Sequence, residues 1–491
     1  MRIWLEDANG LRSSGQGAGH VYFDVTDNPF PTIQAGRPVR YYVTQERERE
    51  RESSAGMNKP PYRVPSMEEI AAIPWNGYKA VSTFSGCGGS SLGYKMAGFR
   101  VLWANEFIPT AQDTYRANHH GTILDTRDIR TVQPADILEA IGMPASELDL
   151  FDGSPPCASF STAGKREAGW GKVKAYSDTK QRTDDLFFEY TRLVKGVQPK
   201  VFVAENVSGL VKGTAKGHFL EILAALKECG YTVSAKLLDA QWLGVPQMRQ
   251  RVIFVGVRND LVTKYGVRPV HPKPLPYRYS VRDALPWITA TLHYGQFENY
   301  TGERERKPSD SPCETIRATQ GGSQQFHVES LPRAYRDKRG AFGNEGDITD
   351  QPAPTVLSDS VGTHWIVEPE ADISRFSIGK LWDEIKPGEQ HPKRFSLVKP
   401  ALDEPCSTID TAGRGDYSPS GQLSRASVVH PTEKRKFSIA ELRRICAFPD
   451  DFIFTGTYAQ QWERMGRAVP PVMMMHIAQA IRTEVLDKCK P

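Results

Sequence analysis

The chain has 491 residues, which predicts two or three domains and leaves ample length to bury a hydrophobic core. Hydrophobic residues make up 39% and charged residues 24%, which excludes disorder of the whole chain, while 41 glycines and 35 prolines exclude a helical bundle or coiled coil. Because the net charge is only +4, a polyanionic partner would have to meet a local basic patch.

Cysteine usage and hydropathy indicate the compartment. The seven cysteines are an odd number without any CxxC pair, which argues against a disulfide framework or a zinc site. No apolar run reaches the roughly 18 residues of a membrane span, and the first ten residues are too polar for a signal peptide. We therefore expect a cytoplasmic protein without a bound metal.

The composition and the spacing of apolar residues change three times along the chain. Residues 1–73 are polar and broken by Gly and Pro. Short apolar runs then alternate with amphipathic stretches, which predicts strands at 80–84, 100–104, 148–152, 200–204, 232–238 and 251–257. Crossover helices are expected between them at 110–118, 184–194 and 217–229. This rhythm indicates a parallel sheet covered by helices.

The alternation is lost between 268 and 434, where Gly, Pro, Ser and Thr dominate, and helical patterning resumes at 438–446 and 472–486. The irregular segment therefore looks inserted. We expect an N-terminal extension at 1–75, a first part of the sheet domain at 76–265, an inserted β-rich domain at 266–434 and a closing part at 435–491.

A short repeat connects the irregular parts. The pattern Asp-x-Pro-x-x-Thr-Ile/Val occurs at 27–33, 310–316, 350–356 and 403–409. Asp and Pro favour a turn, and Thr with a β-branched neighbour favours a strand, so each copy predicts a turn that leads into a strand. Since one copy precedes the sheet domain, we expect the N-terminal extension to pack with the inserted domain.

Residues with chemical potential follow the predicted strands. The first strand runs into the glycine-rich turn FSGCGGSSLG at 84–93, and the second ends at Glu106, whose carboxylate could bind ribose hydroxyls. This pair indicates an adenosine-containing ligand without separating NAD from S-adenosylmethionine. Alternatively, the glycines only allow close packing of helix and strand.

Three further strands end in reactive or charged side chains. Cys157 follows two prolines in a stiff loop at the mouth of the sheet, a position suited to a nucleophile. Glu205 lies at the same rim, and Arg249 and Arg251 project to one side of the fifth hairpin. Each residue alone would be unremarkable, because free cysteines are commonly buried and rim charges are commonly solvated.

In this order the motifs resemble those of the DNA (cytosine-5) methyltransferase family, of the bacterial or phage type. The resemblance comprises the glycine-rich turn, the acidic residue after the second strand, the Pro-Pro-Cys loop, the tripeptide ENV at 205–207 and the segment QMRQR at 247–251. The segments FPDDF at 448–452 and GRAVPP at 466–471 resemble the closing motifs of the family. A Rossmann-like α/β sheet with an inserted, irregular β-rich target-recognition domain is thereby implied.

The resemblance also implies a reaction. The Cys157 thiolate would add to C6 of a flipped-out cytosine, so that C5 can attack the methyl group of S-adenosylmethionine. Glu205 would hold N3 and the exocyclic amine. Arg249 and Arg251 would hold the base oxygen, the backbone or the catalytic loop.

Binding residues are implied in the same way. The glycine-rich turn would surround the methionine part of the cofactor, with further contacts at the ribose and adenine. The implied cofactor set is Phe84, Gly86, Gly88, Glu106, Phe107, Asp128, Ile129, Pro155, Arg467 and Val469. The implied DNA set comprises residues of the loop after the nucleophile and the threonines of three repeat copies: Ser159, Lys165, Arg166, Thr315, Thr355 and Thr408.

Two positions depart from the family pattern. Ala158 stands where the family often has Gln or Asn, and Arg467 stands where it nearly always has Asn. An arginine beside a sulfonium needs an anionic partner. A carboxylate of the protein or of the methionine part would serve. Alternatively, the donor is carboxy-S-adenosylmethionine, held by Arg467, and the product is 5-carboxymethylcytosine.

Other functional classes explain less. A nicotinamide-dependent oxidoreductase would account for the glycine-rich turn and Glu106 but not for Cys157 and Glu205 in their order. A catalytically silent DNA-binding protein would be expected to lack Cys157 or Glu205. A tRNA methyltransferase shares the motifs, but the long insert at 259–435 favours double-stranded DNA. We expect a monomer, with the recognised sequence and any restriction partner left open.

Overall fold

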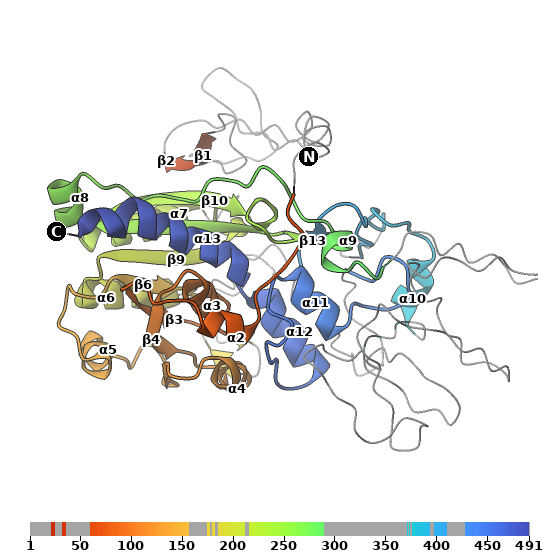
Figure 1. The fold of residues 1–491 in the computed structure, drawn as a ribbon, viewed down its shortest axis with the longest axis horizontal. Helices are drawn as coiled ribbons and strands as arrows, with labels where there is room; N and C mark the ends of the chain where they lie inside the picture. The colour runs from red at the N-terminus through yellow and green to blue at the C-terminus, as the bar shows by residue number, and fades with distance from the viewer. Residues whose placement is uncertain are drawn as a thin grey trace, which may run out of the picture.

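The structure is a computed structural model. It describes residues 59–156, 185–211, 216–288, 371, 373, 376–392, 397–409 and 428–490. It also describes the backbone of four short strands: β1 (Val21–Asp24), β2 (Thr32–Ala35), β7 (Lys174–Tyr176) and β8 (Thr179–Gln181). Figure 1 shows a central sheet crossed by the long helix α13 and continued on one side by shorter helices of the C-terminal half.

A mixed sheet forms the centre of the fold, with the order β1-β2-β10-β12-β9-β6-β3-β4-β5. Five of its strands are parallel: β3 (Lys79–Thr83), β4 (Arg100–Asn105), β5 (Ile123–Asp125), β6 (Leu150–Gly153) and β9 (Val201–Val207). Apart from the edge strand β5, they are rich in buried apolar side chains because helices cover both faces.

The six predicted strands all form, but the parallel arrangement is wrong for two of them. β10 (Tyr231–Asp239) and β12 (Gln250–Arg258) pair antiparallel with each other, and β12 is antiparallel to β9. Only the short segment with η3 (Ala240–Trp242) and β11 (Gln247–Met248) joins them, which is too short for a parallel crossover. The short edge strand β5 was not predicted.

Two hydrophobic cores sandwich the sheet. On one face, α3 (Gly89–Met96) and α13 (Pro471–Ile481) pack together with α2 (Met67–Ala71) and α8 (Asn259–Tyr265). On the other face lie α5 (Pro134–Ile141), α6 (Leu186–Val197) and α7 (Lys216–Glu228). α4 (Pro109–Asn118) follows β4, and η1 (Ser208–Val211) follows β9.

The C-terminal helix completes the core begun near residue 80. A Cβ atom at Gly93 of α3 would lie 2.6 Å from Cβ of Met474 in α13, so only glycine permits this approach of the two helices. After α13 the chain ends in the turns η6 (Arg482–Leu486) and η7 (Asp487–Cys489). The closing part is therefore integral to the sheet domain.

The segment 266–434, predicted to form an inserted domain, packs part of its described residues into the same hydrophobic core as one face of the sheet. It contains α9 (Val281–Ala284), α10 (Ser377–Trp382) and β13 (Cys406–Ser407), and it is followed by α11 (Ile439–Ile445) and α12 (Tyr458–Arg467). β13 belongs to the fourth repeat copy and pairs in parallel with β11. The predicted turn forms at 402–404, but the strand comprises Cys406–Ser407, and the Thr408-Ile409 pair that was predicted to start it lies just beyond its end.

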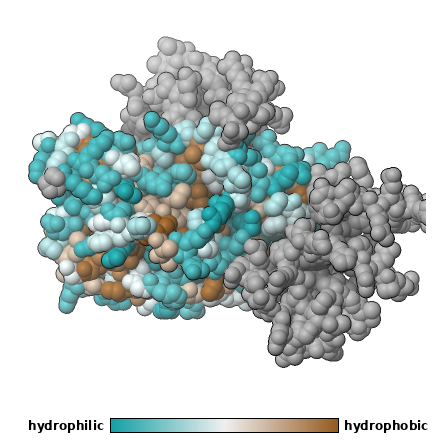
Figure 2. Space-filling view, in the orientation of Figure 1, coloured by the Kyte–Doolittle hydropathy of each residue, from teal (hydrophilic) through white to brown (hydrophobic). Residues whose placement is uncertain are grey.

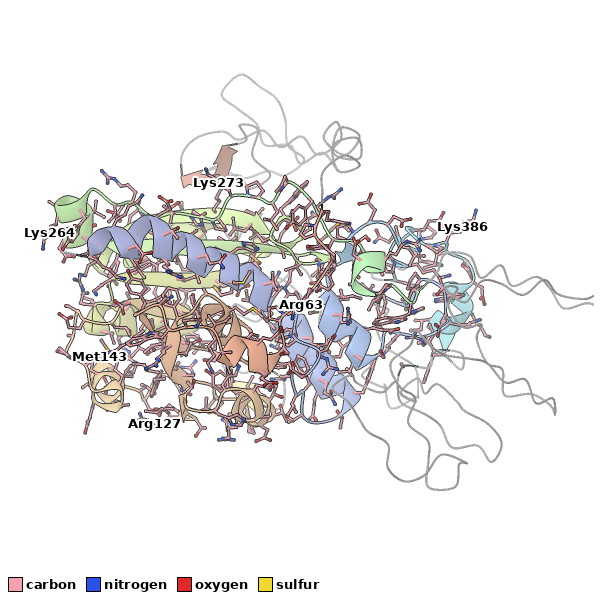
Figure 3. All side chains as sticks on the ribbon, viewed as in Figure 1. Arg63, Arg127, Met143, Lys264, Lys273 and Lys386 are labelled. Carbon is pink, nitrogen blue, oxygen red and sulfur yellow. The ribbon has the colours of Figure 1, made fainter. Side chains whose placement is uncertain are left out.

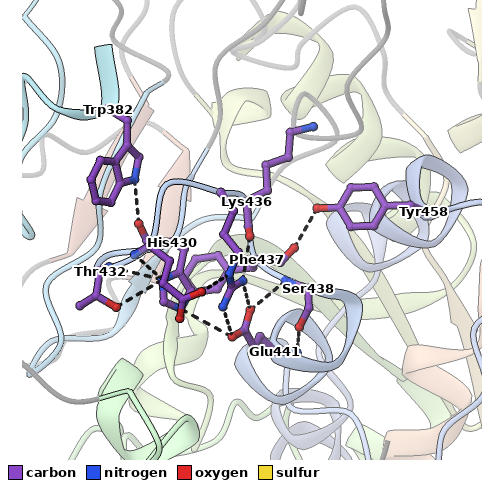
Figure 4. A network of polar contacts seen from close by, with 10 residues as sticks. Trp382, His430, Thr432, Lys436, Phe437, Ser438, Glu441 and Tyr458 are labelled. Atoms are coloured by element: carbon purple, nitrogen blue, oxygen red, sulfur yellow. Dashed lines mark hydrogen bonds and ion pairs between the residues drawn. The ribbon is translucent and has the colours of Figure 1, made fainter. Parts of the chain in front are cut away.

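A buried ionic network fixes the chain where it returns from the inserted domain (Figure 4). Arg435 donates to both carboxylate oxygens of Glu441, at 2.7 and 2.8 Å, and pairs with Glu433 at 2.7 Å. His430 lies 3.6 Å from Glu441, and its carbonyl accepts a hydrogen bond from Trp382 of α10. Burial of an ion pair needs such multiple partners, which couple α10 to the start of α11.

A strap at 59–67 runs along the junction of the two domains, and Arg63 marks it in Figure 3. Lys59 pairs with Asp283 of α9 at 2.6 Å. The Tyr62 hydroxyl donates to the carbonyl of Arg444 in α11 at 2.6 Å, and the Met67 N–H donates to the Asp451 carboxylate. The strap therefore touches both the inserted domain and the closing part.

The described strands of the N-terminal extension lie at the edge of the sheet. β2 contains the Thr-Ile of the first repeat copy and pairs antiparallel with β10, at Ile33 opposite Ala235. The rest of residues 1–58 lies outside the described part. Packing of this extension on the inserted domain therefore stays a prediction.

The surface in Figure 2 carries hydrophobic colour in separate areas among hydrophilic side chains. Large exposed hydrophobic residues lie far apart in the sequence: Phe188 is in α6, and Trp75 and Ile453 are in connecting segments. Single exposed apolar residues of this kind are normal for a folded domain. None of the helices in the described ranges is both apolar and long enough to cross a bilayer.

Candidate active site

The glycine-rich turn leaves β3 with an unusual backbone. Phe84, Gly86 and Gly88 have φ angles of 53°, 56° and 92°, in the left-handed region. A Cβ at Gly88 would lie 2.0 Å from the buried ring of His119, and one at Gly89 would lie 2.3 Å from the carbonyl of Val469. Close packing therefore requires these two glycines.

Gly86 differs, because a Cβ there would meet no atom within 4 Å. Its N–H donates to Glu106 at 2.7 Å, and the other Glu106 oxygen accepts from the N–H of Ile108 at 2.7 Å. The turn thus offers open space next to a fixed carboxylate. The packing interpretation therefore holds for Gly88 and Gly89, whereas binding of a ligand at Gly86 stays a prediction.

Glu106 and Phe107 present a polar and an aromatic group together. Glu106 is only 6% exposed, and burial raises its pKa, while the hydrogen bonds from Ile108 and Gly86 oppose that shift. Phe107 leaves 36% of its surface exposed, although large aromatic residues of the core are fully buried. A carboxylate beside an accessible ring suits a ribose with an adenine base.

The next two predicted cofactor residues differ in exposure. Asp128 pairs with Arg130 at 3.1 Å, and Arg130 also pairs with Asp185 at 2.7 Å. The side chain of Ile129 is buried in the core, so only its backbone remains for a ligand. Asp128 is accordingly restrained by an ion pair at the edge of the predicted adenine site.

Glu205 is the central acidic residue of the rim. Gly153 of β6 is opposite Ala204 of β9, which places Glu205 one position beyond the last pair of the two strands. Its carboxylate pairs with Arg251 at 2.6 Å, and both side chains are about nine-tenths buried. Burial raises the pKa of Glu205, opposed by the charges of Arg251 and Arg249, and burial lowers the pKa of Arg251.

Arg249 acts differently from Arg251. It lies between β11 and β12, is 1% exposed, and donates to the carbonyls of Ile409 and Gly466 at 2.9 and 2.8 Å. It thereby joins the fourth repeat copy to the closing part. These contacts are made to carbonyls of the protein itself, so the roles expected for Arg249 toward the base or the catalytic loop stay predictions. Strand alternation predicted that Arg249 and Arg251 project to the same side of the hairpin, but their side chains bind different partners.

The C-terminal half of α12, which leads into the closing motif, carries three charged residues that pair with one another. Arg467 pairs with Glu463, one helical turn earlier, at 2.6 Å, and Arg464 lies 3.4 Å from the same carboxylate. Glu463 is buried, as is Arg464, whose charge acts on Glu106. Val469 is buried and presents its carbonyl to Gly89. Arg467 thus has the protein carboxylate that its charge demands.

The described residues of this segment end at Pro156, one residue before the predicted nucleophile Cys157. Pro155 is buried, and its carbonyl accepts from the Asn206 side chain at 3.3 Å, which joins the ends of β6 and β9. Outside the described part lie Cys157, Ser159, Lys165, Arg166, Thr315 and Thr355. Thr408 is described, exposed, and donates its hydroxyl to the carbonyl of Met248.

Sequence reasoning missed Asp152, an acidic residue inside β6. It is 1% exposed and accepts hydrogen bonds from Ser82 at 2.9 Å and Tyr94 at 3.0 Å. The available signal was an aspartate within the apolar run that precedes the Pro-Pro-Cys loop, because charged residues are rarely fully buried without partners. In the described ranges, no three His, Cys, Asp or Glu side chains are grouped to hold a metal ion.

Residues 78–483 match the model of the family described as C-5 cytosine-specific DNA methylase. The chain belongs to this family. It is therefore a DNA methyltransferase that acts on C5 of cytosine and uses S-adenosylmethionine.

Individual relatives of this cytosine methylase match over most of their length. It is 38% identical to the Type II methyltransferase M.NgoPII of Neisseria gonorrhoeae, over 85% of this chain and 98% of that protein. It is 29% identical to the Type II methyltransferase M.DdeI of Desulfomicrobium norvegicum, over 82% and 88%. A candidate DNA modification methyltransferase encoded within a prophage of E. coli has the same fold, with a TM-score of 0.54 at 21% identity, over 84% and 100%.

Proposed function

We propose that this methylase transfers the methyl group to a flipped-out cytosine of double-stranded DNA through a covalent bond between Cys157 and C6. The observation that carries the proposal is the buried Glu205–Arg251 pair, at the rim from which the Pro-Pro-Cys loop leaves β6. Burial raises the pKa of Glu205, which favours transfer of a proton between this carboxyl group and N3 of the base. Such a proton is what N3 of the base requires during addition.

The residues of the chain would divide the reaction as follows. The Cys157 thiolate forms a bond to C6, and electron density moves toward N3, where the Glu205 carboxyl group stabilises it by a proton. Arg251 fixes the orientation of Glu205. The bound cofactor supplies an electrophilic methyl group on sulfonium sulfur. Carbon 5 would take that group as the sulfur–methyl bond breaks and a neutral thioether is left. A base such as water would then remove the C5 proton, the N3 proton would return to Glu205, and expulsion of the Cys157 thiolate would restore the ring.

The fit of the cofactor rests on the open space at Gly86 beside Glu106 and Phe107. We assign the glycine-rich turn to its methionine part, Glu106 to the ribose, Phe107 to the adenine face, and Asp128 with Ile129 to the adenine edge. Extrusion of the target base costs a few kcal/mol, which binding of the duplex must supply. We assign phosphate contacts to Lys165 and Arg166, which follow the nucleophile in sequence.

A modification enzyme of a restriction system or a prophage is the biological setting we propose, since the relatives are Type II methyltransferases. The long insert favours duplex DNA over transfer RNA. Bisulfite-type sequencing of host DNA after expression tests activity and recognised sequence together. Recurrent conversion-resistant cytosines in one sequence context are expected. Methylation of transfer RNA with unmodified DNA would contradict the proposal.

Arg467 bears on the choice of donor. Because Glu463 neutralises it at 2.6 Å, we propose S-adenosylmethionine rather than carboxy-S-adenosylmethionine as the donor. With both donors offered in competition, mass spectrometry of digested DNA should find 5-methylcytosine, with the same preference in Arg467→Asn. A preference for 5-carboxymethylcytosine that disappears in Arg467→Asn would contradict this assignment.

The strap gives a prediction for the N-terminal extension. Deleting residues 1–73 removes the contacts of Lys59 and Tyr62 at the domain junction and also helix α2 with its buried Ile70, so duplex binding should weaken by about tenfold or more. Cofactor affinity should stay within about twofold, because the turn at 84–93 is retained. Deletion of residues 1–58 alone is the matched control. Titration calorimetry with duplex and with cofactor measures the two affinities. A separate assay of DNA modification completes the test, because an unchanged rate in the 1–73 deletion would show that the strap is dispensable.

A further inference from the structure

Asp152 is a buried carboxyl group that the proposed chemistry does not use. Its two oxygens accept hydrogen bonds from two different elements of one face, from Ser82 of β3 at 2.9 Å and from Tyr94 of α3 at 3.0 Å. Ser82 and Asp152 are direct neighbours in the parallel pair β3–β6. The carboxyl group therefore links two strands and the helix that opens from the glycine-rich turn.

The hydrogen bonds continue from Asp152 to the cofactor turn. The Ser85 hydroxyl donates to the Ser82 carbonyl at 2.9 Å and lies 3.2 Å from the Ser82 hydroxyl. The next residue, Gly86, donates its N–H to Glu106 at 2.7 Å. A chain of polar contacts thus runs from the carboxylate assigned to the ribose to the interior of β6.

The backbone of β6 is held equally closely on its way to the Pro-Pro-Cys loop. The Asp152 carbonyl accepts from the Thr83 hydroxyl at 3.0 Å. At Gly153 an added Cβ would come within 2.4 Å of the Tyr190 ring and 2.6 Å of the Thr83 hydroxyl, so the strand end cannot shift toward either. Through its carboxylate, Asp152 connects this rigid strand end to the residues that flank the cofactor turn.

We propose that Asp152 is a positioning residue, which fixes the cofactor turn relative to the strand that leads to Cys157; the proposal rests on the function proposed above. The methyl group held by the cofactor turn and the thiolate in the loop after β6 must both reach the same base. An error of about 1 Å in such an arrangement costs on the order of a hundredfold in rate. Neither hydroxyl partner bonds as strongly to a neutral side chain as to a carboxylate.

The charge state of Asp152 predicts a pH dependence of cofactor affinity that can be measured. Burial raises the pKa of Asp152 to about 7, opposed by the hydroxyls of Ser82 and Tyr94 and reinforced by Glu205. The titratable groups that act on it or feel its charge are Glu205 from β9, Tyr94 from α3, Tyr115 from α4 and Tyr190 from α6. Since the ionised form accepts both hydroxyl bonds, cofactor affinity should increase as pH rises through about 7.

Three variants of the full chain test the proposal. Asp152→Leu removes both acceptors, Asp152→Asn keeps the shape but cannot ionise, and Asp149→Asn is a matched control. Asp149 is also buried and bonded to two partners, Lys200 at 2.8 Å and the N–H of Lys79 at 2.9 Å, but at the opposite end of β6. Cofactor dissociation constants without DNA, measured between about pH 6 and pH 8.5, avoid any contribution from the base held by Glu205.

The expected results separate positioning from stability. Asp152→Leu should weaken cofactor binding about tenfold and reduce cross-linking to a 5-fluorocytosine duplex, while Asp149→Asn changes both by less than about twofold at equal folded fraction. Asp152→Asn should bind with an affinity independent of pH across this range. Glu205→Gln should keep the pH dependence but move its midpoint downward, because a neighbouring negative charge is lost.

Two results would overturn the assignment of Asp152. One is cofactor binding and cross-linking by Asp152→Leu that equal those of the unaltered protein. The other is an Asp152→Asn variant with the original pH dependence. By contrast, an unaltered protein that binds cofactor with this pH dependence but methylates no DNA would contradict the proposed function and leave the role of Asp152 in the cofactor turn supported.

Discussion

Replacement of Cys157 by serine is expected to abolish methyl transfer while leaving duplex affinity within a few-fold of the original. A serine hydroxyl is far less acidic than a thiol and supplies almost no anion at neutral pH, so addition to C6 stops. Phosphate contacts that hold the duplex do not depend on this side chain. Transfer of a labelled methyl group measures the loss, and a filter or polarisation assay measures binding.

The same variant should lose covalent capture of DNA. A duplex with 5-fluorocytosine retains the adduct, since fluorine cannot leave as the C5 proton does, and a peptide map should find the base on Cys157. Cys229→Ser is the matched control, because Cys229 is buried between α7 and β10, away from the rim. A cross-link that persists in Cys157→Ser would refute the nucleophile assignment.

Changes in the Glu205–Arg251 pair should have the second largest effect. Glu205→Gln removes the proton donor to N3 and should reduce kcat by about a hundredfold to a thousandfold, with cofactor binding retained. Arg251→Met leaves a buried carboxylate without its 2.6 Å partner and should lower the free energy of unfolding by about 3 kcal/mol. Single-turnover kinetics and urea unfolding measure the two quantities separately.

The stability loss in Arg251→Met should depend on pH. Burial already raises the pKa of Glu205, and removal of the neighbouring positive charge raises it further. A carboxyl group with a raised pKa in the folded state favours folding at low pH, and this contribution is lost as pH rises through that pKa. Unfolding at about pH 5.5 should therefore show a smaller loss than at about pH 8.5.

A double variant supplies the control for this experiment. Glu205→Gln with Arg251→Met has no buried charge at either position and should recover much of the stability lost by Arg251→Met alone. A loss in Arg251→Met that is independent of pH, and is not recovered in the double variant, would mean that packing of the arginine matters more than its charge.

The sequence was sufficient wherever the informative residues are consecutive. The alternation of apolar and polar residues located all six predicted strands, and the segments at 84–93, 205–207 and 466–471 indicated the family before any contact was known. The turn at Gly86 and the carboxylate of Glu106 are about twenty residues apart, yet the pattern of strand ends places both at one edge.

Contacts between distant segments were beyond sequence reasoning. Strand alternation suggested one role for Arg249 and Arg251, but the partners of Arg249 are carbonyls 160 and 217 residues further along. Likewise, Asp152 depends on hydroxyls about 60 and 70 residues earlier. The antiparallel pairing of β10 and β12 follows from the short connection between them, and the pattern of apolar residues does not predict strand direction.

Because α13 packs on α3, we expect this protein to become active only late in its synthesis. The ribosome releases the chain from residue 1 onward, so the face of α3 around Gly93 stays bare until residues 471–481 have emerged. Domains usually fold as units once their core is complete, and an uncovered apolar face exposes nascent chains to aggregation. Stalled or truncated products that lack this last helix should therefore require chaperones and should modify no DNA, even though every proposed catalytic residue is already present in them.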